Sequence, residues 1–193
     1  MTEQKMKVET IPVGSLQTNC YLVYDEETKQ GAIIDPGEEV EKILALVKDR
    51  QITVRSIVHT HGHYDHTGAS EALRRATKAR IMIHQADVDL AGFTPEALLH
   101  DGETVFLGPL EFKVLHTPGH TPGGVSLVGY GIAFTGDTLF NNGVGRSDFT
   151  GGNETALWQS IRQKLFNLPP ETVIYPGHGP ASTIGQEKLR WKS

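Results

Sequence analysis

Five short apolar segments of the chain each lead into histidine or aspartate. They are Ile33–Ile34 before Asp35, Ile57–Val58 before His59 and His61, Val114–Leu115 before His116 and His120, Ala133–Phe134 before Asp137, and Val173–Tyr175 before His178. Short apolar runs bounded by polar or glycine-rich residues are typical of buried strands, and the loops that leave such strands carry functional side chains. If these strands lie side by side, the residues that follow them converge on one edge.

The densest cluster of metal-capable residues is His61-Gly62-His63-Tyr64-Asp65-His66. Alternate residues of an extended loop point to the same side. We therefore expect His61, His63 and Asp65 to face one pocket and His66 to turn toward a neighbouring site. Imidazole nitrogens and carboxylate oxygens are suitable ligands for zinc, iron or manganese.

Three further residues follow other strands, and together with the cluster they are too many for one tetrahedral metal ion. The complete predicted metal site consists of His61, His63, Asp65, His66, His120, Asp137 and His178. Seven groups with one bridging carboxylate make two sites of four ligands each, and two metal ions about 3.5–4 Å apart can clamp a reacting oxygen. We interpret the remaining histidines and Asp35 as core, hydrogen-bonding or turn-forming residues.

The predicted elements are blocks of strands with helices between and after them. Strands are expected at 8–13, 20–24, 32–34, 54–59, 81–83, 103–106, 110–115, 125–128, 132–135 and 172–175. Helices are expected at 40–47, at 69–78, from 154 to 168 and after 183, with helix and loop at 86–100 and a glycine-rich loop at 141–153. This order predicts an α+β or layered α/β domain with helices packed outside mixed sheets.

The 193 residues are expected to form one domain, since domains average about 150 residues. The net charge of −5 argues against non-specific binding of nucleic acid, which requires a positive field. No segment approaches the roughly 18 apolar residues of a membrane span, and the polar N-terminus lacks the apolar region of a signal peptide. The single cysteine, Cys20, cannot form an intrachain disulfide, so the cytoplasm is the expected location.

The pattern H-x-H-x-D-H with spaced His, Asp and His resembles that of the metallo-β-lactamase superfamily over essentially the whole chain. Within it, the sequence is similar to the short, single-domain form of the glyoxalase II-like (hydroxyacylglutathione hydrolase-like) hydrolases. The supporting motifs are TNCYLV at 18–23, TPGHTPG at 117–123, GRSD at 145–148 and PGHGP at 176–180. The resemblance implies an αββα sandwich of two mixed β-sheets flanked by helices, as one domain over residues 1–193, with a binuclear metal site on one edge.

The resemblance also implies which metal ion each residue binds. The first metal ion would be bound by His61, His63 and His120, the second by Asp65, His66 and His178, and Asp137 would bridge them. The cofactors would be two divalent metal ions per chain, with zinc in first place and iron or manganese as alternatives.

The implied activity is hydrolysis of a small-molecule thioester such as S-lactoylglutathione. A hydroxide between the metal ions would attack the thioester carbonyl, because a metal ion lowers the pKa of bound water from 15.7 to about 7. A thiolate leaves readily, so no strong general acid is needed. Asp65 would be catalytic, since it could both bind metal and hydrogen-bond the hydroxide. No nucleic-acid or membrane partner is expected, and the sequence leaves the oligomeric state open.

Two features depart from the long glyoxalase II enzymes. Those enzymes carry a tyrosine where Gly179-Pro180 stands here, and they add a C-terminal helical region that helps to hold glutathione and is not expected in this chain. Arg146 is predicted to contact the substrate in place of a basic residue of the long form. The alternatives are that Arg146 is a surface charge or a partner for Asp148.

A persulfide dioxygenase is the main alternative enzyme. That family is similar in fold, shares H-x-H-x-D-H and has a comparable Gly-Arg-x-Asp-Phe loop, which Phe149 matches, but it binds one iron ion through two histidines and an aspartate. Residues 176–180 favour the hydrolase, and the metal count and oxygen consumption would separate the two. A lactonase and a metal-binding module without turnover stay open, whereas a β-lactamase is disfavoured because it would need an export signal.

Overall fold

The computed structural model describes residues 5–191, which contain two large mixed sheets. The sheet with the longer strands contains the first strands of the chain. This first sheet has the strand order β1-β2-β3-β4-β5-β6. Its strands are β1 (Met6–Val13), β2 (Thr18–Asp25), β3 (Gln30–Ile34), β4 (Thr53–Val58), β5 (Arg80–His84) and β6 (Ala97–Leu99). Strands β1 to β3 pair antiparallel, whereas β3 to β6 run parallel.

The second sheet has the order β14-β13-β10-β9-β8-β7. Its strands are β7 (Thr104–Leu107), β8 (Leu110–His116), β9 (Val125–Gly129), β10 (Ile132–Gly136), β13 (Val173–Pro176) and β14 (Ser182–Thr183). Only β10 and β13 pair in parallel. A small hairpin of β11 (Leu139–Phe140) and β12 (Gly143–Val144) follows β10, and its second strand lies within the segment 141–153 that was expected to be a glycine-rich loop.

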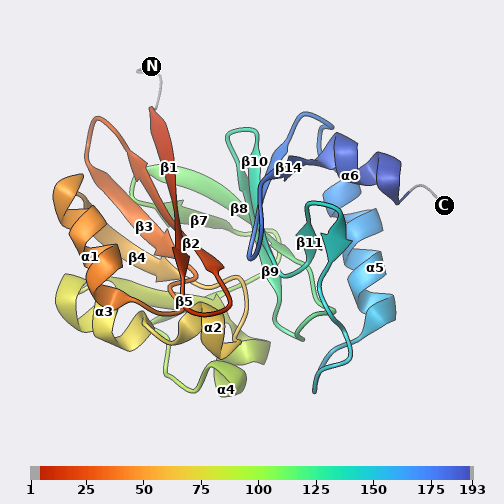
Figure 1. Ribbon diagram of the computed structural model, residues 1–193, viewed down its shortest axis with the longest axis horizontal. Coiled ribbons are helices and arrows are strands. Elements are labelled where there is room, and N and C mark those ends of the chain that lie inside the picture. Colours follow the sequence, from red (N-terminus) through yellow and green to blue (C-terminus); the bar gives the residue numbers. More distant parts are fainter. Residues whose placement is uncertain (1–4, 192–193) are drawn as a thin grey trace.

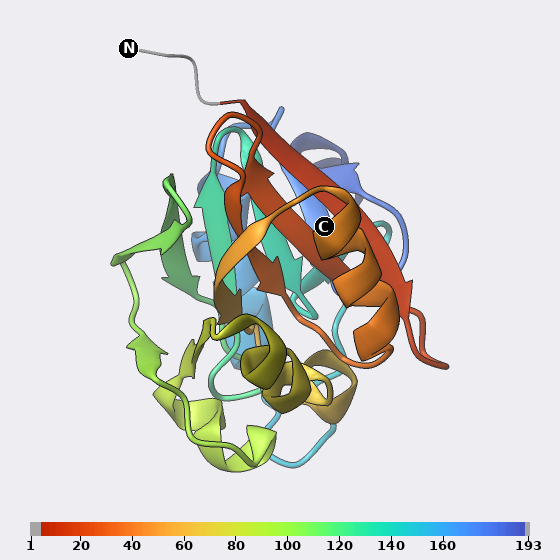
Figure 2. The same cartoon turned by 90° about the vertical axis from the view of Figure 1, so that its left-hand side faces the viewer.

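The two sheets pack face to face with helices outside them, which confirms the predicted αββα sandwich. Helices α1 (Val40–Asp49) and α3 (Ser70–Thr77) cover the first sheet, and α5 (Glu154–Gln163) and α6 (Ile184–Arg190) cover the second (Figure 1). The turned view places α1 and α3 in front of the strands (Figure 2). Buried apolar side chains from both sheets, such as Tyr21, Ile34, Phe112 and Phe134, fill the space between them.

The parallel strand pairs bring the chemically important loops to one edge. Strands β3 and β4 run side by side, so Asp35 and the loop that starts at His59 leave the sheet at the same end. Strands β10 and β13 do the same in the other sheet, where Asp137 and His178 follow them. This arrangement confirms the expectation that the strand ends converge.

Three local expectations were wrong. Residues 61–66 are not one extended loop, because a helical turn, α2 (Tyr64–Thr67), begins at Tyr64, with the His66 amide bonded to the His63 carbonyl. The segment 86–100, expected to be helix and loop, does contain most of a 3₁₀ turn (Gln85–Asp87) and helix α4 (Val88–Ala91), but it also contains the edge strand β6, which was not expected. Helix α5 ends at Gln163, and a 3₁₀ turn (Leu165–Asn167) follows it. This turn ends at Leu168, which is extended because it precedes Pro169.

Within residues 5–191, no helix combines the length and apolarity that a membrane crossing requires.

Candidate metal centre

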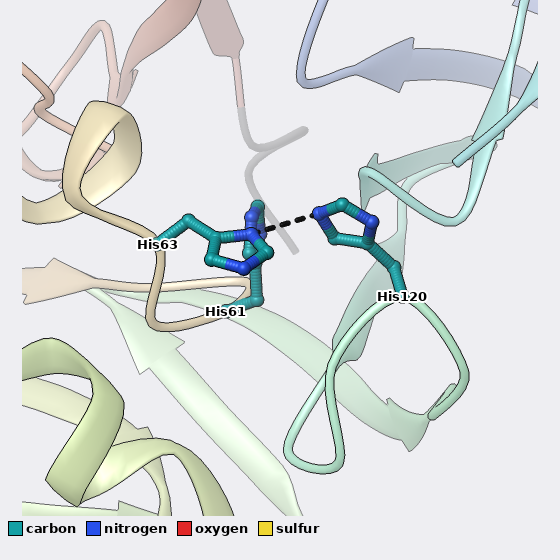
Figure 3. A group of neighbouring side chains, drawn as sticks. All are labelled: His61, His63 and His120. Carbon is teal, nitrogen blue, oxygen red and sulfur yellow. Dashed lines mark hydrogen bonds between the residues drawn. The ribbon is translucent and has the colours of Figure 1, made fainter. Parts of the chain in front are cut away.

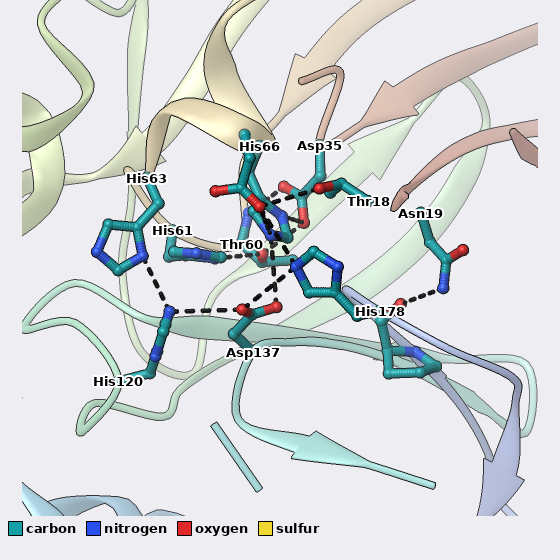
Figure 4. A network of polar contacts seen from close by, with 12 residues as sticks. Thr18, Asn19, Asp35, Thr60, His61, His63, His66, His120, Asp137 and His178 are labelled. Atoms are coloured by element: carbon teal, nitrogen blue, oxygen red, sulfur yellow. Dashed lines mark hydrogen bonds and ion pairs between the residues drawn. The ribbon is translucent and has the colours of Figure 1, made fainter. Parts of the chain in front are cut away.

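The seven predicted ligands lie together at the shared edge of the two sheets, and Figure 4 labels each of them except Asp65. They come from the loop after β4 (His61 and His63), from α2 (Asp65 and His66), and from the loops after β8 (His120), β10 (Asp137) and β13 (His178). Residues more than 100 positions apart in the sequence therefore contribute to one site.

His61, His63 and His120 form the first group (Figure 3). One ring nitrogen from each of these residues lies within 4.8 Å of the others. The closest approach is 2.9 Å, between Nδ1 of His63 and Nε2 of His120. Three imidazoles this close are typical of a metal site, since three nitrogens can then share one cation.

Asp65, His66 and His178 form the second group. The Asp65 Oδ2 atom lies 3.5 Å from Nε2 of His66 and 3.3 Å from Nε2 of His178. The same oxygen accepts a hydrogen bond of 2.9 Å from the Thr18 hydroxyl. The extended-loop argument that placed Asp65 beside His61 and His63 was wrong, because the turn of α2 directs Asp65 toward His178 instead.

Asp137 lies between the two groups. Its Oδ2 atom is 3.5 Å from Nε2 of His120 and 3.6 Å from Nε2 of His178, and its Oδ1 atom is 3.4 Å from Nε2 of His66. One carboxylate thus faces nitrogens of both groups. This is the position that a bridging ligand requires.

In four of the histidines, a polar contact orients the ring nitrogen that faces away from the centre of the site. Each of these nitrogens faces an oxygen: His61 Nδ1 the Thr60 hydroxyl, His66 Nδ1 the Asp35 carboxylate, His120 Nδ1 the Arg146 carbonyl and His178 Nδ1 the Leu16 carbonyl. An acceptor on one ring nitrogen fixes the proton there and leaves the lone pair on the other. The four Nε2 atoms are therefore oriented as ligands.

The inner atoms of the site fit a cation. His61 Nε2, His66 Nε2 and Asp137 Oδ1 are buried and have no hydrogen-bond partner. Buried polar atoms are nearly always hydrogen-bonded, so three such atoms in and between the two ligand groups need an explanation. Divalent metal ions supply it, and the nitrogen and oxygen donors suit zinc, iron or manganese alike.

The electrostatics of the site agree with this interpretation. Burial lowers the pKa of His61 well below its ordinary value, and the nearby His66 and His120 lower it further. Burial also disfavours a charge on His66, but the carboxylates of Asp137 and Asp35 outweigh burial and raise its pKa. Burial would raise the pKa of Asp137, yet the neighbouring imidazoles, His66 foremost, hold it below its ordinary value. The Asp137 carboxylate is thus ionised at neutral pH, the form that metal binding requires.

Asp35 supports the site from behind. Its carboxylate accepts hydrogen bonds from the Thr60 amide at 2.8 Å, from the Thr60 hydroxyl at 2.5 Å and from His66 Nδ1 at 3.1 Å. It forms a third potential metal group with His61 and His66. Because these three hydrogen bonds already engage both of its oxygens, we assign Asp35 to orientation of His66 rather than to metal binding, in line with the sequence interpretation.

Asn19 fastens the loop that carries His178. Its side-chain amide nitrogen donates to the carbonyls of Pro176 and Gly179 at 3.0 and 2.8 Å, and its backbone amide donates to the carbonyl of Gly177 at 2.7 Å. The motif at 18–23 therefore has a physical role: Thr18 orients Asp65 and Asn19 orients the last ligand loop.

Asp87 is a buried residue of the site that sequence reasoning missed. Its carboxylate accepts hydrogen bonds from the Gly62 amide at 2.9 Å, the Thr121 hydroxyl at 2.7 Å and the Gly123 amide at 2.6 Å. Gly62 separates His61 from His63, and Thr121 follows His120. Asp87 thus joins the two loops that hold the first group, and it lies in a segment whose sequence shows no clear pattern.

The loop after β12 holds Asp137 and His120 through its backbone. A Cβ atom at Gly145 would lie 1.7 Å from the Asp137 carbonyl oxygen, so only glycine fits there. The Arg146 carbonyl accepts from His120 at 2.6 Å, while its guanidinium is bonded to Asp148 at 2.8 and 2.9 Å. The proposed pairing of Arg146 with Asp148 is confirmed, and its contact with substrate stays a prediction.

The remaining histidines of the chain lie outside both groups. His59 is buried against the Ser70 hydroxyl at 3.0 Å, and burial lowers its pKa to about 4, so it is a neutral core residue. The rings of His84 and His116 stack with their centroids 4.3 Å apart. These positions agree with the interpretation of these residues as core or hydrogen-bonding groups.

A cavity of about 470 Å³ opens onto the centre. Its floor includes His63, Asp65, His120, Asp137 and His178, and its walls include Leu16, Tyr64, Leu90, Phe149 and Thr150. Both groups of potential ligands are therefore accessible to a small molecule from solvent.

Fold and site together define a metal-binding αββα protein, and the chain belongs to the metallo-beta-lactamase superfamily, whose family model matches residues 13–178. Among characterised proteins it is similar to the hydroxyacylglutathione hydrolase GloC of Haemophilus influenzae, with 39% identity over 203 residues that cover 95% of each chain.

Solved structures resemble the chain over nearly its whole length. The BLEG-1 B3 metallo-beta-lactamase has 36% identity and a TM-score of 0.87, covering 95% of this chain and 97% of its own. TTHA1623, crystallised in a di-iron-bound form, has 37% identity and a TM-score of 0.83, with coverage of 93% and 96%. ETHE1 from Myxococcus xanthus has 35% identity and a TM-score of 0.84, with coverage of 94% and 81%. Proteins of several names thus share this fold.

Proposed function

We propose that the chain is a metal-dependent hydrolase of small-molecule thioesters, of the glyoxalase II type, with two divalent metal ions held by the seven grouped residues. The observation that carries the proposal is the position of Asp137, whose two oxygens face nitrogens of both ligand groups at 3.4 to 3.6 Å. The similarity to a hydroxyacylglutathione hydrolase supports the thioester as the bond cleaved.

When bound, the metal ions would lower the pKa of water and polarise the thioester carbonyl. The protein's own part is to orient the groups around the reacting atoms. Asp65 lines the cavity and accepts a hydrogen bond at Oδ2 from the Thr18 hydroxyl, so its carboxylate would be held where it can accept a hydrogen bond from the attacking hydroxide. The departing thiol has an ordinary pKa of about 8.5, so it leaves as a thiolate without a dedicated acid.

The test is hydrolysis of S-lactoylglutathione by the purified protein, with the metal content measured on the same sample. We expect two metal ions per chain and turnover that Asp137→Asn reduces at least a hundredfold. Asp49→Asn is the matched control, because Asp49 is an exposed residue of α1 far from the ligand loops. One iron ion per chain with oxygen consumed on a persulfide would instead establish the dioxygenase alternative, and bound metal without turnover on either substrate would indicate a binding module.

A further inference from the structure

The cavity above the ligand groups has an apolar rim. Leu16, Tyr64, Leu90 and Phe149 all line it, with 63%, 74%, 44% and 42% of their surfaces exposed. They come from four separate segments: the turn between β1 and β2, helix α2, helix α4 and the loop after β12. Single exposed apolar residues are ordinary, but a group of them around one opening marks a binding surface.

The rest of the described surface carries few residues of this kind. Residues 5–191 expose seven large apolar side chains, and four of the seven line this one cavity. The other three, Phe106, Tyr130 and Leu189, lie outside it. The apolar surface is thus concentrated where a substrate would enter.

Within residues 5–191, the walls of the cavity, away from the proposed metal ions, carry no cationic side chain that could bind an anionic group. None of the described residues that line it is lysine or arginine, whereas Asp65 and Asp137 are part of its floor. Arg146 lies close in the sequence to the wall residue Phe149, but its guanidinium is paired with Asp148 and lies 4.3 Å from the ring centre of Phe149. The arginine therefore extends the wall instead of offering a free charge.

We propose that the substrate carries an uncharged, apolar group, aliphatic or aromatic, next to the carbonyl that is attacked, and that this group packs on Leu16, Leu90 and Phe149. The inference rests on the proposed thioester hydrolysis and specifies its substrate class. The apolar group can belong to the acyl part or to the thiol part of the thioester, since either one adjoins the carbonyl.

The test compares kcat/KM along two series of neutral thioesters. The acyl series pairs the acetyl with the hexanoyl thioester of N-acetylcysteamine, and the thiol series pairs S-acetyl-N-acetylcysteamine with S-benzyl thioacetate. We expect kcat/KM to rise at least tenfold in one series, which corresponds to about 1.4 kcal/mol of transition-state binding, and the series that responds identifies the apolar part. Equal values in both series would overturn the inference while leaving the proposed hydrolase intact.

Variants connect the preference to the rim. Leu16→Ser and Leu90→Ser should each reduce the preference for the apolar substrate at least threefold. Leu189→Ser is the matched control, since this leucine of α6 is 69% exposed and lies outside the cavity. An equal effect of all three variants would contradict the inference. A further outcome would also contradict it: kcat/KM is equal along both series, and the protein forms dimers that Leu16→Ser or Leu90→Ser abolishes. The rim would then bind a second copy of the chain.

A binding measurement covers the case in which no thioester is hydrolysed. That outcome would refute the proposed function, but the inference could still be tested with 2-octanone and 2-butanone. Both ketones keep the carbonyl, and they differ only in their apolar chains. Ligand-observed NMR with the metal-loaded protein should show at least tenfold tighter binding of 2-octanone, reduced by Leu90→Ser. Equal affinities would overturn the inference independently of turnover.

Discussion

The ring of His66 lies between two carboxylates, with Asp35 Oδ2 3.1 Å from Nδ1 on one side and Asp137 Oδ1 3.4 Å from Nε2 on the other. Asp35 therefore determines which nitrogen of His66 is free to bind metal. Its backbone supports this role, because Asp35 adopts a left-handed conformation, with φ of 51°, at the end of β3. Such a conformation is uncommon for a residue other than glycine and here turns the chain toward α2.

We predict that Asp35→Asn weakens metal binding without unfolding the chain. An amide offers one acceptor where the carboxylate now accepts three hydrogen bonds, so His66 loses its fixed orientation. Loss of such a supporting group lowers metal affinity about 10- to 100-fold. Competition with a chromophoric chelator measures the affinity. Asp25→Asn is the control, because Asp25 is equally buried but holds only the turn at Thr28, and an equal loss there would argue against this role.

Asp87→Ala should affect the first ligand group more than the second. The substitution leaves the buried amides of Gly62 and Gly123 without an acceptor, at a cost of about 1–3 kcal/mol each. The loops of His61, His63 and His120 then lose their common anchor. Metal analysis of the dialysed variant should give close to one ion per chain, and urea denaturation should show a lower free energy of unfolding. Full retention of two ions would show that Asp87 contributes to stability alone.

The sequence predicted the strands and the grouping of the metal-capable residues better than it predicted the local turns. An apolar run that ends in His or Asp indicates a strand, because the buried residues and the metal-capable residue are then at separate, adjacent positions of the sequence. The turn at Tyr64 carries no comparable signal, since a single helical turn is too short to show a period of 3.6 residues. Its consequence is large, because the turn decides that Asp65 joins His178 rather than His61.

The supporting residues were largely beyond the reach of the sequence. Asp87 follows an ordinary strand, and its partners, Gly62 and Gly123, are 25 and 36 residues away. Nothing in one sequence relates positions so far apart before the strands are paired. The edge strand β6 was missed for a similar reason: Ala97-Leu98-Leu99 has no strand preference of its own and is extended because it pairs with β5.

Gly145→Ala should reduce activity through the backbone alone. The new methyl group would overlap the Asp137 carbonyl oxygen at 1.7 Å, so the Asp137 peptide has to move and its carboxylate with it. We expect thioester hydrolysis to fall at least tenfold, with reduced metal content. Gly143→Ala, in the adjacent strand β12, is the matched control, because its methyl group would meet only Phe140 at ordinary contact distance. Equal activity of the two variants would refute the argument.

Cys20 should stay unreactive in the folded protein. Burial raises the pKa of its thiol well above the ordinary value, and nearby Asp35 adds to the effect. A free thiol is about half ionised at pH 8.5, whereas this thiol should stay protonated at that pH. A thiol-specific colorimetric reagent at pH 8.5 should therefore react with the chain only after denaturation. Rapid reaction of the native protein would show that β2 opens far more readily than its burial suggests.

Removal of metal should destabilise the fold at the edge where the two sheets meet. Without a cation, His61 Nε2, His66 Nε2 and Asp137 Oδ1 stay buried without a hydrogen bond. A ligand present at about 100 times its dissociation constant stabilises the native state by about 2.7 kcal/mol. For a chain of this size each kcal/mol changes Tm by about 2–4 °C, so EDTA should lower Tm by about 5–10 °C. Differential scanning calorimetry measures this shift. Added zinc should restore the original Tm. The decrease caused by EDTA should be as large in Asp49→Asn and much smaller in Asp137→Asn, whose site has lost the shared carboxylate. A Tm that EDTA leaves unchanged, with metal loss verified, would show that the seven grouped residues do not depend on a cation for their arrangement.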